Sequence, residues 1–461
     1  MFDAKIYTKR RKLLKKEFKK GILLFLGNTE LPMNYPQNVY HFRQDSSFLY
    51  FFGIDEPGLA AIIDLDNKKE IIFGDDVDIE DVIWTGPLPL LKDKITNVGV
   101  AECAPFSKLS EYLENAKTQN RKIHFLPPYH PNNQILLNTS LDIPFGKLKE
   151  NASPELINVV VKLRSLKGRE EIKEIENGMK TAYKMFTTAM KMAKPGLFEY
   201  EVAGKMEGIA RAKNGSLSFP TILSVRGEIL HGHYHNNQMK DGDLLLIDAG
   251  FETPNGYATD HTRVVPVNGK FTQKQKEIYQ IVLDSQLAAI DAIKPGVTYQ
   301  SIHLLSCKVI AKGLKYLGLM KGDVDEAVKA GAHAMFLPHG LGHMMGLDVH
   351  DMEDIGQIFV GYDDEVRPSD QFGTAYLRMG RRLQPGFVIT VEPGIYFIPD
   401  LFNLWKSEKK FTEFINYDKV AEYLGFGGIR IEDDVLVTDD GHKVLGKPIP
   451  KTIEEVEGLF K

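Results

Sequence analysis

The sequence predicts a two-domain protein, in which an α/β amino-terminal domain precedes an α+β domain built from two related halves. The chain has 461 residues, which is more than a single hydrophobic core usually serves. Strand-like and helix-like segments alternate over the first 150 or so residues. In the rest of the chain, the tripeptide Lys-Pro-Gly ends two amphipathic helices, and the two prolines lie 100 positions apart. These observations set the two domains at residues 1–155 and 156–461.

The composition is that of an ordinary soluble globular protein, with 43% apolar and 26% charged residues. A net charge of −5 gives no electrostatic reason to expect nucleic acid or an acidic membrane as a partner. No segment approaches the length of a membrane span. The two cysteines, Cys103 and Cys307, fall in different predicted domains, so a disulfide framework is not expected. The composition therefore predicts a cytoplasmic protein in a reducing compartment.

The first domain reads as a scaffold. Its basic start, KRRKLLKKEFKKG, lacks an apolar core of signal-peptide length and predicts a solvated helix. Strands are expected in GILLFLGN, AAIIDLD, KEIIFGDD and KIHFLPP, and a helix is expected in SKLSEYLENAK. Because this part has neither a phosphate-binding glycine loop nor a dense cluster of acids, we expect it to support or oligomerise the protein.

The second domain shows an internal repeat. A helix is expected from about Arg169, and it ends at Lys194-Pro195-Gly196; another is expected over residues 273–293, before Lys294-Pro295-Gly296. An amphipathic helix follows each breaker, over residues 200–213 and 299–317. Each half then supplies two acidic strands, so pseudo-twofold packing of a duplicated unit would bring four carboxylates to one centre.

Five side chains in or beside apolar, strand-like runs are the candidate metal ligands. Carboxylates are normally excluded from such surroundings unless a positive charge compensates them. Four acids and one imidazole carry about the charge that two divalent cations require, and such a pair can hold a shared water as hydroxide. The sequence therefore predicts a two-metal hydrolytic centre. The five residues are Asp248, Asp260, His343, Glu392 and Glu432.

The two acids of the first half are expected on one hairpin. Asp260 follows Asp248 by 12 residues, with the turn Pro254-Asn255-Gly256 between them. The two carboxylates would then face each other across the strand pair. The alternative is that Asp248 caps a turn before a glycine, and the second acid across the hairpin weakens that reading.

The two acids of the second half also follow strand patterns. Alternation puts Val388, Thr390 and Glu392 on one face. Arg430 and Glu432 are also two positions apart, which places them on one face of a strand, so the guanidinium is expected to orient that carboxylate. A surface ion pair is the alternative, and the apolar strand that continues after Glu432 disfavours it.

Two histidine clusters complete the candidate site. His339, His343 and His350 lie within twelve residues, and Pro338 together with three glycines argues against a regular helix there. Glycines permit close backbone approach, which favours a site. The second cluster is either a surface metal-scavenging tract or the source of one site residue. Its members are His231, His233 and His235.

The motifs HGLGHMMGLDVHD, VEPGIYF and GGIRIEDDVLVTDDG resemble the signatures of the Xaa-Pro peptidases, aminopeptidase P and prolidase, in the pita-bread metallopeptidase family. RQDSSFLYFFGIDEPG resembles the start of that group's N-terminal domain, so the resemblance runs from about residue 40 to the C terminus. It implies a creatinase/aminopeptidase P-like α/β domain over residues 1–155. It also implies a pita-bread catalytic domain with pseudo-twofold symmetry over residues 156–461.

The resemblance also implies roles for individual residues. The five candidate ligands would hold two divalent ions, with Asp260 and Glu432 bridging them. The ions are expected to be Mn²⁺, with Co²⁺ or Zn²⁺ as substitutes. DHTR departs from the family's usual DITR, which places His261 beside a ligand, where it can alter metal preference.

The other implied roles are catalytic and substrate-binding. Glu392 would accept a proton from the attacking water and pass it to the leaving proline nitrogen. His350 and His339 would lie near the scissile carbonyl and stabilise the oxyanion. His231 would bind substrate, and Arg430 matches the family's active-site arginine. The prolyl nitrogen carries no hydrogen, so a pocket built for it discriminates by fit.

Three functions remain open at this point. The preferred one is an Xaa-Pro aminopeptidase that accepts longer peptides with proline second. The first alternative is a prolidase restricted to dipeptides, towards which the segment from YLRMGRRLQPG to FGGIRIEDDV leans. The second is a metal-free pseudoenzyme that acts as a binding module, which the presence of all five candidate ligands disfavours.

The expected partners are a proline-containing peptide substrate and further copies of this chain. The resemblance implies that the N-terminal domain helps to close the site and to form a homodimer or a higher homo-oligomer. Trp84 in VIWTGPLP is expected either to reach a neighbouring active site or to pack in the core of the first domain.

Overall fold

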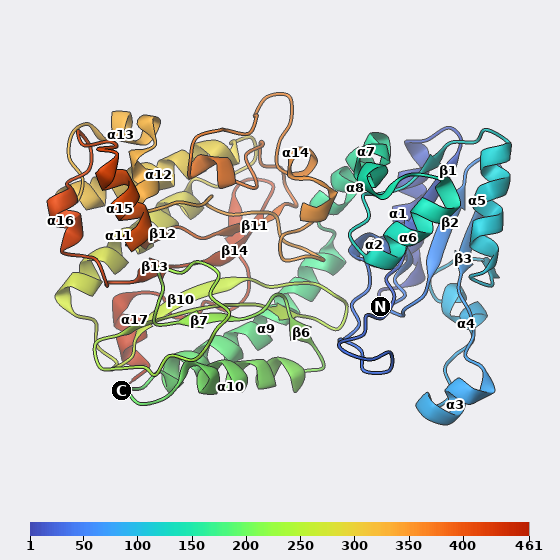
Figure 1. Ribbon diagram of the computed structural model, residues 1–461, viewed down its shortest axis with the longest axis horizontal. Helices are drawn as coiled ribbons and strands as arrows, with labels where there is room; N and C mark the ends of the chain where they lie inside the picture. Colours follow the sequence, from blue (N-terminus) through green and yellow to red (C-terminus); the bar gives the residue numbers. More distant parts are fainter. Residues whose placement is uncertain (461) are drawn as a thin grey trace. The chain divides into compact units, whose positions relative to one another are not determined.

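The computed structural model describes residues 1–460 and divides them into two compact units (Figure 1). One unit comprises Met1–Arg164 and the short segment Asp354–Phe359. The other comprises Ser165–Glu353 and the residues from Val360 onward. Among residues 1–460, no helix is both long enough and apolar enough to span a membrane.

The first unit contains one mixed sheet with the strand order β4-β3-β2-β1-β5. β1 pairs antiparallel with β2, and β2 with β3, whereas β3 and β4, and β1 and β5, run parallel. The four expected strands are therefore confirmed, although the last is limited to two residues. The bounds are β1 (Ile22–Leu26), β2 (Ala60–Asp64), β3 (Lys69–Phe73), β4 (Glu102–Ala104) and β5 (Ile123–His124).

The first helix is not simply solvated, as its basic composition had suggested. Arg11 is fully buried and donates hydrogen bonds to the backbone carbonyls of Phe51, Val98 and Gly99, while its Nε pairs with Glu70 at 2.8 Å. The sequence showed the basic run but not these acceptors. The helices are α1 (Ala4–Lys16), α2 (Ser46–Phe52), α3 (Ile79–Thr85), α4 (Leu91–Thr96), α5 (Lys108–Thr118), α6 (Pro131–Leu141), η1 (Phe145–Lys147), α7 (Leu148–Asn151) and α8 (Pro154–Ser165).

α3 carries the most exposed apolar surface of the first unit. Trp84 is 80% exposed, and Ile79 and Ile83 are also exposed. Helix α3 buries none of its own residues. The reading of Trp84 as a core tryptophan is therefore wrong.

The second unit contains the two expected helix pairs, which pack against each other within each pair. The strands that carry the candidate site lie between the α9/α10 pair and the α11/α12 pair (Figure 1). The pairs are α9 (Arg169–Met192), α10 (Glu199–Arg211), α11 (Gln273–Asp291) and α12 (Tyr299–Tyr316). The shorter helices of this unit are α13 (Val324–Ala330), η2 (Ala332–Met335), η4 (Thr374–Tyr376), α15 (Pro399–Ser407), α16 (Tyr417–Ala421) and α17 (Ile453–Gly458). Most of η3 (Glu353–Ile355) and α14 (Gln357–Val360) lies in the segment that belongs to the first unit.

The backbone after each Lys-Pro-Gly breaker repeats the same hydrogen bonds. Gly196 donates to the carbonyl of Met239 and Gly296 to that of Leu383, each at 2.9 Å. Both glycines have positive φ, of 93° and 86°, which a side chain would strain. Two residues after the glycine, the first half has the isolated β-bridge Phe198↔Gln238, and the second half has the corresponding β-bridge Thr298↔Arg382. This correspondence is far more specific than a three-residue match and supports the duplicated unit.

Each half supplies a three-stranded sheet, with the orders β10-β8-β7 and β11-β14-β15. An isolated bridge between Thr262 and Glu432 joins the two halves. The bounds are β7 (Ile222–Ser224), β8 (Leu244–Ala249), β10 (His261–Pro266), β11 (Val388–Val391), β14 (Asp433–Val437) and β15 (His442–Val444). Two shorter pairs are β6 (Ser216–Leu217) with β9 (Phe251–Glu252), and β12 (Gly394–Tyr396) with β13 (Gly428–Arg430).

The first-half hairpin forms, but its register differs from the expected one. Asp248 lies opposite Thr262, not opposite Asp260. Because alternate residues of a strand share a face, Asp260 still lies on the same side as Thr262 and sits diagonally across from Asp248. The short strand β9 and the turn after it lie between β8 and β10 in the sequence. Their residues therefore do not take part in the β8–β10 pairing, as they would in a simple hairpin.

Candidate metal centre

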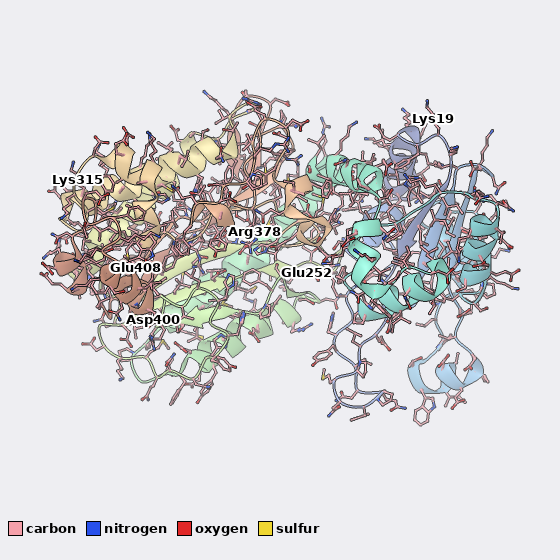
Figure 2. The ribbon with its side chains drawn as sticks, turned by 45° about the horizontal axis from the view of Figure 1, so that its top comes forward. Lys19, Glu252, Lys315, Arg378, Asp400 and Glu408 are labelled. Carbon is pink, nitrogen blue, oxygen red and sulfur yellow. The ribbon has the colours of Figure 1, made fainter. Side chains whose placement is uncertain are left out.

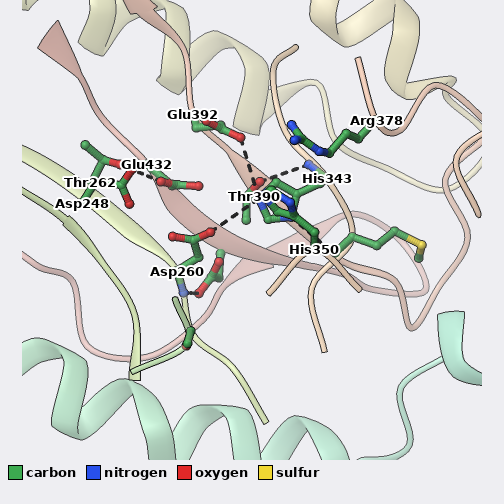
Figure 3. A network of polar contacts seen from close by, with 12 residues as sticks. Asp248, Asp260, Thr262, His343, His350, Arg378, Thr390, Glu392 and Glu432 are labelled. Atoms are coloured by element: carbon green, nitrogen blue, oxygen red, sulfur yellow. Dashed lines mark hydrogen bonds and ion pairs between the residues drawn. The ribbon is translucent and has the colours of Figure 1, made fainter. Parts of the chain in front are cut away.

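The five candidate ligands converge on one point in the second unit (Figure 3). The Nε2 atom of His343 lies 3.4 Å from Oδ2 of Asp260 and 3.8 Å from Oε1 of Glu392. One ligand atom from each of Asp260, His343 and Glu432 lies within 4.8 Å of the other two. Residues up to 184 positions apart in the chain, Asp248 and Glu432, thus meet where the strands of the two halves end.

A cavity of about 660 Å³ opens onto this point. It is lined by all five candidate ligands and by the four other predicted site residues, His231, His339, His350 and Arg430. His233 also lines the cavity, so two members of that cluster face it, and the expectation that one of them acts in the site stays a prediction. The ring of His235 instead lies 3.1 Å from the carbonyl of Thr221.

The buried acids fit divalent cations. Burial raises the pKa of Asp260 and of Glu432 well above the usual range, and neighbouring carboxylates raise both further. Burial also raises the pKa of Glu392 to about 7. Within residues 1–460, Oδ1 of Asp248 and Oδ1 of Asp260 have no hydrogen-bond partner. Crowded, desolvated oxygen atoms of this kind are compensated by bound cations.

The geometry of His343 sets its tautomer. Its Nδ1 lies 3.0 Å from the backbone carbonyl of Met344, which can only accept, so Nδ1 carries the hydrogen. The Nε2 lone pair therefore faces Asp260 and Glu392, as a metal ligand requires. Hydrogen bonds with Thr390 fix the backbone on both sides, from His343 N to Oγ1 and from Thr390 N to the His343 carbonyl.

Arg430 orients a different carboxylate from the expected one. Its Nη2 lies 2.5 Å from Oδ2 of Asp248, and its Nε donates to Oγ1 of Thr262 at 3.1 Å. The Thr262 hydroxyl in turn donates to Oε2 of Glu432 at 2.7 Å. The direct pairing of Arg430 with Glu432 was therefore wrong, because the sequence could not show that Asp248 and Thr262 intervene. Arg430 is buried, which excludes a surface ion pair.

Tyr396 connects Arg430 to His339. Arg430 Nη1 donates to the Tyr396 hydroxyl at 2.7 Å, and that hydroxyl lies 2.9 Å from Nε2 of His339. Burial lowers the pKa of His339 to about 3, and Arg430 lowers it further. The imidazole is therefore neutral at neutral pH, with the tyrosine hydroxyl as its donor. Tyr396 belongs to the VEPGIYF motif but was not singled out from the sequence.

His350 belongs to a charged cluster at the cavity wall. Its Nδ1 contacts Glu353, which also accepts a hydrogen bond of 3.0 Å from Nε of Arg378. The contact with His350 lowers the pKa of Glu353 to about 2. Arg378 lines the cavity on the loop after η4 (Figures 2 and 3). Arg378 was not singled out from the sequence, because the basic run LRMGRR does not show which of its side chains faces a cavity.

His261 does not add a ligand to the centre. Neighbouring residues of a strand point to opposite faces, so His261 points away from the side that carries Asp260 and Thr262. Its ring packs 5.7 Å from that of Phe186 on α9, and burial lowers its pKa to about 3. An influence of His261 on metal preference stays a prediction.

A buried ion pair fixes the loop that carries His343 and His350. Nζ of Lys167 lies 2.7 Å from Oδ2 of Asp351, and both side chains are 1% exposed. Asp351 also donates its backbone N–H to the Met344 carbonyl at 2.8 Å. This pair tethers the loop to the segment before α9. Its partners are 184 positions apart, so no sequence pattern indicated it.

We expect Lys167→Met to lower the free energy of unfolding by about 3–5 kcal/mol, because it leaves the Asp351 carboxylate buried without its cation. Denaturant unfolding, followed through the unfolding transition of the second unit, would measure this change in free energy. The matched control is Lys308→Met in the same unit, where both Lys308 and its partner Asp325 are exposed; we expect less than about 1 kcal/mol there. Equal effects in the two variants would contradict the assignment.

Two family models match the chain. The model described as metallopeptidase family M24 matches residues 173–439, and the aminopeptidase P N-terminal domain matches residues 7–124. A protein from Homo sapiens named Xaa-Pro dipeptidase is 33% identical, over 91% of this chain and 84% of its own length. A protein from Escherichia coli named Xaa-Pro aminopeptidase is 31% identical, over 98% of this chain and 97% of its own length.

Solved structures show the same fold over the whole chain. Zinc-substituted E. coli aminopeptidase P in complex with product superposes with a TM-score of 0.81 at 31% identity, covering 100% of this chain and 98% of that one. Aminopeptidase PepP of Pseudomonas aeruginosa also gives 0.81, at 29% identity and the same coverage. The expected architecture, an aminopeptidase P-type N-terminal domain before a metallopeptidase domain, is confirmed. The chain is a peptidase and belongs to metallopeptidase family M24.

Proposed function

We propose that this peptidase removes the N-terminal residue from peptides with proline in second position. The observation that carries the proposal is the convergence of four acids and His343 on a cavity lined by His231, His339 and His350. Relatives of nearly the same length are named for action on Xaa-Pro bonds. The proposal assigns the catalytic part to residues 156–461 and the supporting part to residues 1–155.

The five candidate ligands would hold two divalent ions, with Asp260 and Glu432 shared between them. Mn²⁺ is our proposed metal, with Co²⁺ or Zn²⁺ as substitutes, because the donor set is rich in oxygen. When bound, such ions lower the pKa of a water and polarise a carbonyl. Arg430 supports the ligand set by holding Asp248 directly and Glu432 through Thr262.

The remaining steps belong to side chains of this chain. Glu392 lies beside His343, and we assign the proton transfer to it: its carboxylate would accept a proton and its acid form would return that proton to the prolyl nitrogen. His350 and His339 line the cavity beside the ligand set, and we assign to them the stabilisation of the developing oxyanion. His231 lines the same cavity and would contact the substrate.

Arg378 favours a second candidate, the dipeptidase. The carboxylate of an Xaa-Pro dipeptide lies one residue from the scissile bond, and a cavity-lining guanidinium can pair with it. A longer peptide has an amide at that position. We nevertheless prefer the aminopeptidase, since the chain aligns over 97% of the length of the bacterial Xaa-Pro aminopeptidase.

A comparison of Xaa-Pro with Xaa-Pro-Yaa peptides tests this preference. We expect wild-type protein to cleave both. Arg378→Met should lower kcat/KM for the dipeptide by about 10- to 100-fold, through the loss of a charged hydrogen bond, and affect the tripeptide less. Arg367→Met, at an exposed position on the same connecting segment, is the control. Cleavage of dipeptides alone would reject the aminopeptidase.

The binding-module alternative is tested by metal content and activity together. We expect purified protein to contain up to two divalent ions per chain, by elemental analysis, and to hydrolyse proline peptides. Protein that takes up no metal and leaves these peptides intact would be a pseudoenzyme. A cytoplasmic location stays a prediction.

We also propose that the chain forms a homodimer or higher oligomer through α3. Exposed tryptophan and isoleucine side chains on one short helix are typical of an interface. Trp84→Glu should therefore shift the protein to smaller species in analytical ultracentrifugation without lowering its stability. Tyr316→Glu, at a 90% exposed aromatic on α12, is the control. Unchanged assembly of the Trp84 variant would rule out this interface.

A further inference from the structure

A second cluster of metal-ligating side chains lies in the core of the second unit, outside the candidate metal centre. His303 and Cys307 are on α12, and His333 is on η2. All three are fully buried. None of them lines the cavity of about 660 Å³ or contacts the five candidate ligands through a described hydrogen bond.

The spacing suits a shared ion. Residues four apart on a helix lie on one face, and Sγ of Cys307 lies 3.6 Å from Nε2 of His303. One ligand atom from each of the three residues lies within 4.8 Å of the other two. Bonds of about 2.0 Å to nitrogen and 2.3 Å to sulfur keep ligand atoms less than about 4.3 Å apart. A small inward movement of one ring therefore completes the site.

His333 gives an independent indication of a ligand. Neither of its ring nitrogens has a hydrogen-bond partner of acceptable geometry in the described part of the chain. A buried polar atom without a partner is costly, and native structures rarely keep one without a compensating group. Its ring faces the edge of the His303 ring, at 6.4 Å between centroids. A cation bound between the rings would satisfy both.

The groups around the three side chains determine which ionic charge this cluster can accommodate. Burial lowers the pKa of His303 to about 3 and that of His333 to about 4, so both rings are neutral. Burial raises the pKa of the Cys307 thiol, and no described carboxylate is among the groups that shift these three pKa values. A divalent ion on one thiolate and two imidazoles would leave one positive charge in the apolar core. A monovalent ion leaves none.

We propose that His303, Cys307 and His333 form a second metal site, which binds one soft monovalent cation of the copper(I) class. Thiolate and imidazole ligands suit such ions, whereas the oxygen-rich centre suits harder ones. On binding, the Cys307 thiol gives its proton to solvent and its sulfur bonds to the ion, so the complex is neutral. His333 lies six residues before His339, so an occupied site would also anchor the start of the catalytic segment.

The test uses the full chain loaded with Mn²⁺, so that the first centre is occupied. Copper(I) is supplied from a bicinchoninate buffer with ascorbate and without oxygen, over hours, at a temperature that allows local opening. We expect one copper per chain after desalting, in wild type and in Cys103→Ser, whose exposed thiol is the matched control. Cys307→Ser should bind at least 100-fold more weakly. X-ray absorption should show sulfur and nitrogen neighbours.

A second variant keeps the test decisive. His333→Leu removes an imidazole whose ring nitrogens have no hydrogen-bond partner of acceptable geometry, although the Val328 backbone lies near enough to raise its pKa. The variant should therefore fold, and it should lose at least tenfold in copper affinity. Circular dichroism checks the fold of both variants, and if either is unfolded the absorption spectrum of wild type decides. Each of four results would overturn the proposal. They are copper bound through Cys103, oxygen-rich coordination of the copper, no uptake of copper, and Zn²⁺ bound through Cys307 in place of copper(I).

Discussion

Replacing Glu392 by glutamine is expected to lower kcat by about two to four orders of magnitude, because proton transfer by a positioned side chain contributes about that much. An amide cannot accept and return a proton, yet it has nearly the same shape as the acid. In the metal-free centre, burial raises the pKa of Glu392 to about 7. The fold should be retained, since the change removes a charge from a crowded acidic centre.

Steady-state assays on an Xaa-Pro-Yaa peptide, with metal content measured on the same samples, would check this result. The metal measurement is needed because Glu392 is also a candidate ligand. Activity lost while metal is retained assigns the proton-transfer role, and metal lost in parallel assigns ligation alone. Glu326→Gln on α13, an exposed position, is the control. Near-normal turnover of the Glu392 variant would remove this residue from the mechanism.

Asp260→Asn is expected to abolish metal binding and activity while making the metal-free protein more stable at pH 8. The pKa of Asp260 is raised by burial and by the nearby carboxylates of Glu432 and Asp248. An acid with a raised pKa binds more protons in the folded state than in the unfolded state. Its contribution to stability is therefore present below the unfolded pKa, near 4, and is lost as pH rises through the folded pKa. Asparagine removes this loss.

Denaturant unfolding after chelation, at pH 5 and pH 8, measures the effect. Metal-free wild type should be less stable at pH 8, and each unit by which the pKa is raised corresponds to about 1.4 kcal/mol. The Asp260 variant should show a smaller drop. Adding Mn²⁺ at 100 times its Kd should stabilise wild type by about 2.7 kcal/mol and leave the variant unchanged. Full metal occupancy in the variant would contradict a bridging role for Asp260.

The acids of the candidate metal centre could be singled out from the sequence because each is a charged residue in or beside an apolar, strand-like run. A carboxylate inside an apolar strand signals compensation, and this signal is local, so Asp248, Asp260, Glu392 and Glu432 were all found. The Lys-Pro-Gly repeat likewise anticipated the two helix pairs. Glycine-rich surroundings had already singled out the cluster that contains His339 and His350, and the resemblance to the family then assigned roles to these two histidines.

What the sequence did not show depends on register and on distant partners. Asp248 faces Thr262 because β9 and its turn take up residues between the strands, and turn geometry sets register. Arg430 reaches Asp248, 182 residues away, and Lys167 reaches Asp351, 184 residues away. A charged residue does not reveal its partner over such separations. Arg378 was missed for a different reason: a run of basic residues does not show which of its side chains lines a cavity.

The paired backbone pattern after Gly196 and Gly296 has a consequence for the origin of this centre. Each half brings two carboxylates and a comparable helix pair, so neither half alone encloses a complete ligand set. An ancestor the length of one half would have assembled the four acids only by associating with a second copy of itself. In this chain His231 belongs to the first half and His343 to the second, an asymmetry that lets the shared centre bind a peptide in a single direction.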